Sequence, residues 1–197
     1  MGSAPQPAPL RGWRVRHHRL STRVYPPSRN TAWLTWLGDE RIAVGNLPTA
    51  ASIVRLPDEG VTHVVNCRAR LQTVVSGDLA VERALFGRER VARAAMWDDG
   101  KPKPPALWTP AARFAADALD DPEARVFIHC QAGRRRSVLV AYAVLRLRGH
   151  GSDSAERLIL DHRTEAQLVP AYRDSVERWL ADGGEDDGPP APPAAAQ

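Results

Sequence analysis

The stretch that decides the fold is Val126-Phe-Ile-His-Cys-Gln-Ala-Gly-Arg-Arg-Arg-Ser-Val-Leu-Val140. Its apolar and β-branched opening predicts a buried strand over residues 125–129. A polar loop follows, and the apolar run from Ser137 to the next glycine predicts a buried helix. The segment therefore places Cys130 at the end of a strand and Arg136 six positions later, directly before a helix.

A loop wrapped over a helix N-terminus directs several backbone N–H groups inward and so forms a cradle for an anion. The same donors stabilise a thiolate, so we expect the pKa of Cys130 to lie well below that of a free thiol. Gly133 permits the tight turn that such a cradle requires. Arg136 can hold two phosphate oxygens at once. The hydroxyl of Ser137 can donate toward the sulfur and ease its departure as a leaving group.

The remaining sequence predicts an α/β domain around this loop, with a mostly parallel central sheet flanked by helices. Besides 125–129, strands are expected over 41–44, 61–66 and 90–97. Helices are expected near 49–56, 78–86, 109–119, 137–148, 152–162 and 169–181. Pro110 suits the first turn of the helix over 109–119, with Thr109 as its cap.

Composition predicts one folded domain over residues 33–181 between two irregular ends. Residues 1–32 read as a flexible arm rich in Pro and Arg, and residues 182–197 as a disordered tail rich in Pro, Ala and Gly. No stretch approaches the roughly 20 apolar residues of a membrane span, and residues 1–20 lack the apolar core of a secretory signal.

The chain contains two cysteines and carries a net charge of +4. Two cysteines cannot form a disulfide framework, which agrees with a reducing compartment, so we expect a cytoplasmic protein. They are also too few for a cysteine-rich zinc site. The modest positive charge favours anionic partners only weakly.

The central segment closely resembles the signature loop of the protein tyrosine phosphatase superfamily, which is His-Cys, five residues, Arg and Ser or Thr. The run His129-Cys-Gln-Ala-Gly133 is especially similar to dual-specificity phosphatases of the MAP-kinase-phosphatase kind. Weaker likenesses extend the resemblance over roughly residues 38 to 180. Rhodanese-like domains usually have a shorter spacing from Cys to Arg, and low-molecular-weight phosphatases carry the motif near the N-terminus, so both fit less well.

This resemblance implies a cysteine-dependent phosphatase that needs neither a metal nor a cofactor. Cys130 would be the nucleophile and Arg136 the phosphate clamp, with Ser137 beside them. The backbone of the loop between them would bind phosphate, and its members are Gln131, Ala132, Gly133, Arg134 and Arg135.

The family also supplies an aspartic acid on a mobile loop, about 30 residues before the cysteine, to protonate the leaving group. Asp98 and Asp99 lie 32 and 31 positions before Cys130. The run from Trp97 to Asp99 resembles the Trp-Pro-Asp loop of tyrosine phosphatases, whereas the spacing of Asp98 suits many dual-specificity members. The sequence does not separate the two, and whichever is not the acid would be a solvated loop charge.

Four further residues each allow two interpretations. His129 can simply end its strand, or it can hold the loop and Cys130 in place. Cys67 can be a buried structural thiol, or it can form a reversible disulfide with the nucleophile, as a cysteine in this neighbourhood does in related phosphoinositide phosphatases. Arg134 and Arg135 can be a solvated rim, or they can favour a highly anionic substrate, as the basic loop of some lipid phosphatases suggests.

We therefore expect a phosphomonoester hydrolase acting on phosphotyrosine, phosphoserine or phosphothreonine of proteins. Alternative substrates are phosphoinositides, other lipid phosphates or small phosphorylated metabolites. A catalytically weak phosphate-binding module is a further alternative, which the Cys, Arg and Asp residues disfavour. Nucleic-acid binding through the basic segment from Arg11 to Arg29 lacks a supporting motif, so we expect no specific nucleic-acid partner.

Overall fold

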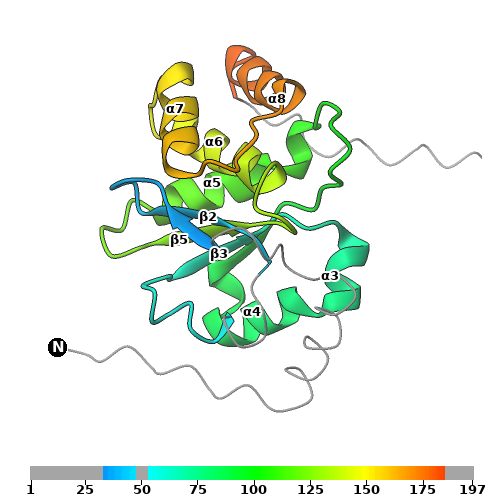
Figure 1. The fold of residues 1–197 in the computed structure, drawn as a ribbon, viewed down its shortest axis with the longest axis vertical. Helices are drawn as coiled ribbons and strands as arrows, with labels where there is room; N and C mark the ends of the chain where they lie inside the picture. Colours follow the sequence, from blue (N-terminus) through cyan, green and yellow to red (C-terminus); the bar gives the residue numbers. More distant parts are fainter. Residues whose placement is uncertain (1–32, 48–52, 185–197) are drawn as a thin grey trace, which may run out of the picture.

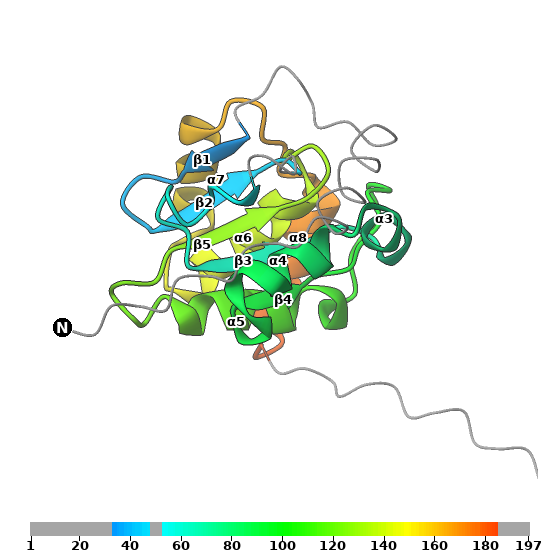
Figure 2. The ribbon, with the colours of Figure 1, turned by 90° about the horizontal axis from the view of Figure 1, so that it is seen from below.

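A five-stranded sheet forms the centre of the structure, a computed structural model that describes residues 33–47 and 53–184. The strand order is β1-β2-β5-β3-β4, which can be followed across Figure 2. All neighbouring strands are parallel except β1, which runs antiparallel to β2. The strands are β1 Leu34–Trp36, β2 Ile42–Gly45, β3 His63–Asn66, β4 Val91–Arg93 and β5 Val126–His129.

Helices cover both faces of the sheet (Figure 1). One face carries α5 Thr109–Ala118, α6 Arg136–Leu147, α7 Ser152–His162 and α8 Pro170–Ala181. The other carries α3 Arg70–Ser76 and α4 Asp78–Phe86. Two short 3-10 turns, η1 Arg88–Arg90 and η2 Pro105–Leu107, complete the described elements. The prediction of a mostly parallel sheet flanked by helices is confirmed.

Alternation along the strands builds one apolar core on each face, because successive side chains of a strand point to opposite sides. In β5, Val126 and Ile128 belong to the core beneath α6, and Phe127 belongs to the core beneath α4. Helix α6 lies deepest, since all its residues from Arg136 to Leu145 are buried. This buried helix fixes the position of the loop that precedes it.

Several predicted elements differ from the structure. Strand β4 ends at Arg93 rather than near residue 97, because its partner β3 ends at Asn66, whose carbonyl oxygen accepts the last hydrogen bond, from Ala94 N. The N-cap of α5 is Trp108, and Thr109 is the first residue of the helix rather than its cap. The arm over 1–32, the first half of the helix over 49–56 and most of the tail over 182–197 lie outside the described residues.

Strand β1 and helix α3 were absent from the prediction. Strand β1 has only three residues, too few for an alternating pattern to be recognised. Helix α3 exposes its apolar residues Leu71 and Val74 and buries Thr73 and Ser76, so its pattern is the reverse of an ordinary amphipathic helix. Among the described residues, none of the helices combines the length and apolar character needed to cross a membrane.

Gly45, at the end of β2, generates a stability prediction. A Cβ atom there would lie 1.9 Å from the carbonyl oxygen of Trp33 and 2.6 Å from the ring of Phe127. We expect Gly45→Ala to lower the free energy of unfolding by about 1–3 kcal/mol, the usual cost of overpacking a core, as measured by urea denaturation. Gly151→Ala meets no atom within 4 Å and should cost less than about 1 kcal/mol. Equal stability of the two variants would contradict the close packing at Gly45.

Candidate active site

The sulfur of Cys130 lies at the carboxyl end of β5, the central strand, and faces the N-terminus of α6. The residue is 1% exposed. The backbone N–H of Gly133 donates to Cys130 Sγ at 3.2 Å, and Ser137 Oγ lies 3.4 Å from the same sulfur. The structure thus brings together the predicted nucleophile, the predicted hydroxyl donor and the loop glycine.

Three carbonyl groups of the loop, and that of His129 directly before it, accept hydrogen bonds from residues outside the loop. Since the C=O and N–H groups of a trans peptide point in opposite directions, carbonyls that face outward leave N–H groups facing inward. The donor–acceptor pairs are Cys67 N to His129 O at 2.8 Å, Leu47 N to Gln131 O at 3.2 Å, Arg163 Nε to Gly133 O at 2.8 Å, and Gln167 N to Arg134 O at 2.7 Å.

Gly133 is required both by its conformation and by its surroundings. Its φ of 68° lies in the left-handed region, which side chains rarely adopt. A Cβ atom would also lie 2.5 Å from the carbonyl carbon of Gly45 and 2.7 Å from the nitrogen of Asn46. The loop therefore packs directly on the end of β2, and this contact leaves no room for a larger residue.

Arg136 is 3% exposed and is the first residue of α6. Its Nη1 donates to Gln72 Oε1 at 2.8 Å and to the carbonyl oxygen of Met96 at 3.1 Å. Its Nε is buried and has no hydrogen-bond partner among the described residues. An anion in the loop would supply an acceptor for this buried donor, which otherwise carries a free-energy cost.

The electrostatic surroundings of Cys130 favour the thiolate. Burial raises the pKa of the thiol. The Arg136 guanidinium and the hydrogen bonds from Ser137 and Gly133 lower it by more, so the resulting pKa is about 7. The ordinary value for cysteine is about 8.5. The lowered pKa therefore favours the thiolate form of Cys130 at a lower pH than for an ordinary cysteine.

His129 is fully buried and pairs with Glu82 of α4, with Nε2 lying 2.7 Å from Glu82 Oε1. Burial lowers the pKa of His129, but the Glu82 and Asp78 carboxylates together raise it more, so the net shift is upward. The ring also stacks on Phe127 with centroids 5.3 Å apart. The structure thus places His129 in a buried ion pair that anchors the residue preceding Cys130 to α4.

This ion pair belongs to a larger buried network on the α4 face. Arg68 Nη1 lies 2.8 Å from Asp78 Oδ2, and Asn66 Nδ2 donates to both Asp78 and Glu82. Burial raises the pKa of Asp78, but Arg68 and the Ser76 hydroxyl lower it more. Asp78, Glu82 and His129 lie close enough to hold a metal ion, yet Arg68 and His129 already balance the two carboxylates. These three side chains therefore fit a structural network of ion pairs better than a metal site.

Cys67 lies directly beyond β3 and is completely buried, and both it and Cys130 are free thiols. Burial raises its pKa well above the ordinary range, and the neighbouring Cys130 raises it further. Its backbone N–H donates to the carbonyl oxygen of His129 at 2.8 Å, so the two cysteines follow adjacent paired positions of neighbouring strands. The geometry is compatible with either role foreseen for Cys67.

The two candidate acids occupy different surroundings. Asp98 Oδ1 accepts a hydrogen bond from the Tyr172 hydroxyl at 3.2 Å and lies 3.9 Å from Arg135 Nη1 on the phosphate loop. Asp99 pairs with Lys103 and accepts from the N–H of Lys101 at 3.0 Å. The hydrogen bond from Lys103 is the main cause that lowers the pKa of Asp99. Only Asp98 is therefore seen in contact with the loop that holds Cys130.

Helix α8 holds the segment that carries these acids. The N–H of Gly100 donates to the Tyr172 hydroxyl at 3.2 Å, and the N–H of Lys103 donates to Ser175 Oγ at 2.9 Å. Lys103 Nζ also lies 5.2 Å from the centre of the Tyr172 ring. Tyr172 thus connects the backbone of this segment with the carboxylate of Asp98.

The two arginines of the loop rim differ in their contacts. Both are exposed, but Arg135 Nε donates to Gln167 Oε1 at 2.8 Å while its Nη1 approaches Asp98. Arg134 is fixed through its backbone, whose carbonyl accepts from Gln167 N. The side chain of Arg135 therefore joins the loop to the acid segment, and that of Arg134 faces solvent.

Sequence reasoning missed four residues that the structure places around the site: Gln72, Glu82, Arg163 and Tyr172. Each is far from Cys130 along the chain, and each acts through one long-range contact described above. None of them belongs to a motif recognised in the sequence, so no local signal identified them.

No family model matches the sequence, and no curated protein matches it either. Solved structures match with high structural similarity. The crystal structure of PTPMT1 in complex with PI(5)P has a TM-score of 0.64 and 20% identity, covering 77% of this chain and 96% of that chain. Human DUSP28 has a TM-score of 0.61 and 18% identity, covering 78% and 97%.

A third similar structure is a human tyrosine phosphatase-like serine/threonine/tyrosine-interacting protein, with a TM-score of 0.59 and 14% identity over 77% of this chain and 98% of that chain. At such low sequence identities, the structural similarity shows the fold alone. The chain has the fold of dual-specificity phosphatases in the protein tyrosine phosphatase superfamily, as the sequence resemblance predicted.

The environment of Cys130 generates a chemical prediction. The rate of alkylation by iodoacetamide should rise with pH to a plateau, with a midpoint at about pH 7, because only the thiolate reacts. Arg136→Met removes the neighbouring cation and should raise this midpoint by about one unit or more. Mass spectrometry of Cys130 peptides gives both values, and the buried Cys67 serves as a slow internal control. A midpoint near that of a free thiol would refute the proposed environment.

Proposed function

We propose that this protein hydrolyses phosphomonoesters through a phosphocysteine intermediate. The observation that carries the proposal is a buried thiol of lowered pKa inside a loop whose carbonyls are held outward, next to the guanidinium of Arg136. Such a loop binds a phosphate dianion through inward N–H groups, and the thiolate then lies beneath the phosphorus. The likeness in fold to phosphatases supports the same conclusion.

In the first step, the thiolate of Cys130 attacks phosphorus and forms an S–P bond while the bond to the leaving oxygen breaks. Asp98 donates a proton to that oxygen. The N–H groups of residues 131–136 and the Arg136 guanidinium stabilise the equatorial oxygens. These groups supply the positive charge that the reaction needs, so we expect it to proceed without a divalent metal or a cofactor.

In the second step, water attacks the phosphocysteine and the S–P bond breaks. Asp98, now ionised, accepts a proton from that water. The Ser137 hydroxyl, which lies 3.4 Å from the sulfur, stabilises the departing thiolate. Inorganic phosphate and the original thiolate are the products, which completes the cycle.

We assign the acid role to Asp98 rather than Asp99 for two reasons. The contact with Arg135 directs Asp98 toward the phosphate loop, whereas Asp99 is engaged by Lys103. A general acid must also be protonated when the substrate binds. The lowered pKa of Asp99 works against that requirement.

The proposed substrates are phosphorylated proteins, with phosphotyrosine, phosphoserine and phosphothreonine as the reacting groups. A lipid phosphate is the second candidate, because exposed apolar side chains flank the contacts of Arg136. Leu71 is 59% exposed beside Gln72, and Trp97 is 56% exposed beside Met96. The solvent-facing Arg134 and the likeness to PTPMT1 crystallised with PI(5)P support this alternative.

We further infer that residues 33–181 form the catalytic domain, with 1–32 as an arm and 182–197 as a tail. Among the described residues 33–47 and 53–184, the side chains of both apolar cores come from within 33–181, which supports this division. A cytoplasmic location is supported by the two free thiols.

Hydrolysis of p-nitrophenyl phosphate tests the proposed function. We expect activity that is unchanged by EDTA and reduced by at least about a thousandfold in Cys130→Ser, since the hydroxyl is a far weaker nucleophile. Cys67→Ser is the matched control and should retain the chemical step. Lack of activity in folded, reduced protein would favour a phosphate-binding module. Assays on a phosphotyrosine peptide and on phosphatidylinositol 5-phosphate vesicles then rank the two substrate classes.

The acid assignment makes a separate prediction. Asp98→Asn should lower kcat on p-nitrophenyl phosphate by roughly a hundredfold or more and remove the fall in activity at alkaline pH, because no proton is then available from this position. Asp99→Asn removes the same charge from the neighbouring residue and should change kcat by less than about fivefold. The reverse ranking of the two variants would transfer the role to Asp99.

A further inference from the structure

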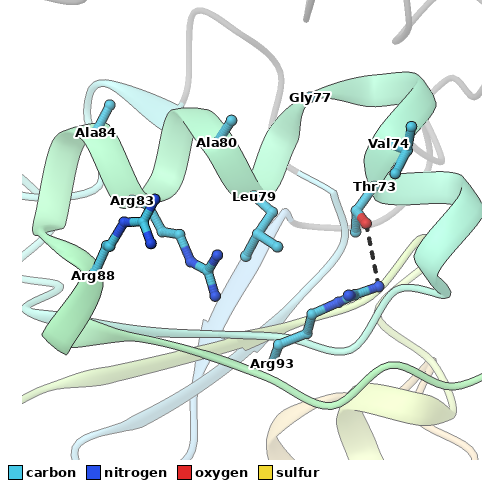
Figure 3. A pocket seen from close by; sticks show the side chains of 9 residues that line it. All are labelled: Thr73, Val74, Gly77, Leu79, Ala80, Arg83, Ala84, Arg88 and Arg93. Carbon is cyan, nitrogen blue, oxygen red and sulfur yellow. Dashed lines mark hydrogen bonds between the residues drawn. The ribbon is translucent and has the colours of Figure 1, made fainter.

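A groove lined by arginines lies beyond the edge strand of the sheet, between α3, α4 and β4 (Figure 3). Its volume is ≈ 470 Å³, within the range of small-molecule pockets. Arg83 enters from α4, Arg88 from η1 and Arg93 from β4. Figure 3 shows the side chain of Leu79 between Arg83 and Arg93, so the groove combines positive charge with a small apolar wall.

The positive charge of this groove is unbalanced within the part of the chain that the structure describes. No ion pair to Arg83, Arg88 or Arg93 is formed by a carboxylate of residues 33–47 or 53–184. The Nε atoms of Arg83 and Arg93 are buried and lack hydrogen-bond partners there. Arg93 has one hydrogen bond, to Thr73 Oγ1 at 3.4 Å.

The acidic residues of the surrounding elements do not neutralise the positive charge of this groove. Asp78 and Glu82 face the sheet interior, where Arg68 and His129 hold them. Glu89 is exposed beside Gly87. Burial lowers the pKa of Arg93, and repulsion from Arg70 and Arg83 lowers it further, although Asp78 acts in the opposite direction. The arginines of the groove therefore lie close together without a carboxylate counterion among the described residues.

The groove is separate from the loop of Cys130. Arg93 pairs with Asn66, and Asn66 pairs with His129, so two strand spacings, roughly 10 Å, separate the backbones of Arg93 and His129. None of residues 130–137 lines the groove. The proposed reaction at Cys130 therefore makes no use of it.

We propose that this groove binds a phosphate ester with two or more negative charges, as a second site distinct from the catalytic loop. A carboxylate would neutralise only one of the three guanidinium groups, whereas a phosphate dianion or a polyphosphate matches their charge. Guanidinium groups donate in pairs to phosphate oxygens, which also satisfies the two buried Nε donors. The ligand can be a soluble phosphate ester or the headgroup of a membrane lipid, since both present the same chemistry.

The test is titration of the full chain carrying Arg136→Met, which removes the phosphate clamp of the catalytic loop. The probes are soluble inositol trisphosphate and phosphatidylcholine vesicles with or without phosphatidylinositol bisphosphate. We expect one bound trisphosphate per chain. Arg83→Gln and Arg93→Gln should each weaken binding about tenfold, the usual effect of removing a charged hydrogen bond. Arg88→Gln, at an exposed position that does not endanger folding, should also weaken it.

Arg90→Gln is the matched control, because it removes the same charge from an exposed residue that acts on His63 rather than lining the groove. It should change the affinity by less than about twofold. Binding of soluble trisphosphate identifies a soluble ligand, and binding to phosphoinositide vesicles alone identifies a headgroup. No binding in either form, or equal weakening by Arg90→Gln and the groove variants, would overturn the proposal. Hydrolysis of p-nitrophenyl phosphate, measured on groove variants with Arg136 intact, reports on the proposed function independently.

Discussion

The outward anchoring of the phosphate loop is the constraint on which the rest of the site depends. A chain that turns back over a helix N-terminus gains nothing as an anion site unless its carbonyl groups point away, and here each outward carbonyl has a donor. Arg163 is the donor that brings a buried charge. The residue is 1% exposed, and its guanidinium donates to the carbonyl oxygen of Gly133 and to the hydroxyl of Thr35. Burial lowers the pKa of this arginine, so its position is maintained against an electrostatic cost. The loop carbonyl is one of the groups that compensates.

The opposite face of the sheet supports the proposed nucleophile in another way. His129 precedes Cys130, so any displacement of its ring moves the sulfur. Glu82 holds that ring from α4, while Asp78 and Arg68 complete a buried group of alternating charges. Such a group is sensitive to substitution, since removal of one partner leaves an uncompensated charge in the interior. Helix α4 thus supports the proposed nucleophile indirectly, through the contact between Glu82 and His129.

Local features of the site were predictable from the sequence, and long-range ones were not. The strand, loop and helix around Cys130 follow from a continuous segment in which apolar pattern, glycine position and charge agree. The choice between Asp98 and Asp99 required Tyr172, which lies 74 positions beyond Asp98. Helix α3 escaped prediction because its apolar residues face outward. The clamp on Arg136 was missed with it, since Gln72 belongs to that helix. Contacts between distant segments leave no period or motif in one sequence.

The attachment of the acid segment to α8 separates the proposed nucleophile from the proposed proton donor in mechanical terms. The sulfur is supported by β5, α4 and α6, whereas Asp98 depends on Tyr172 and the segment around it on Ser175. The proposed nucleophile and the proposed acid are thus held in place by different helices and strands. Under the proposed mechanism, substitutions in α8 would act on the protonation of poor leaving groups more directly than on thiolate reactivity, with the Arg135–Asp98 contact as the link between the two. The proposed mechanism thus allows substitutions in α8 to change the leaving-group preference of this protein while the loop around Cys130 keeps its own residues.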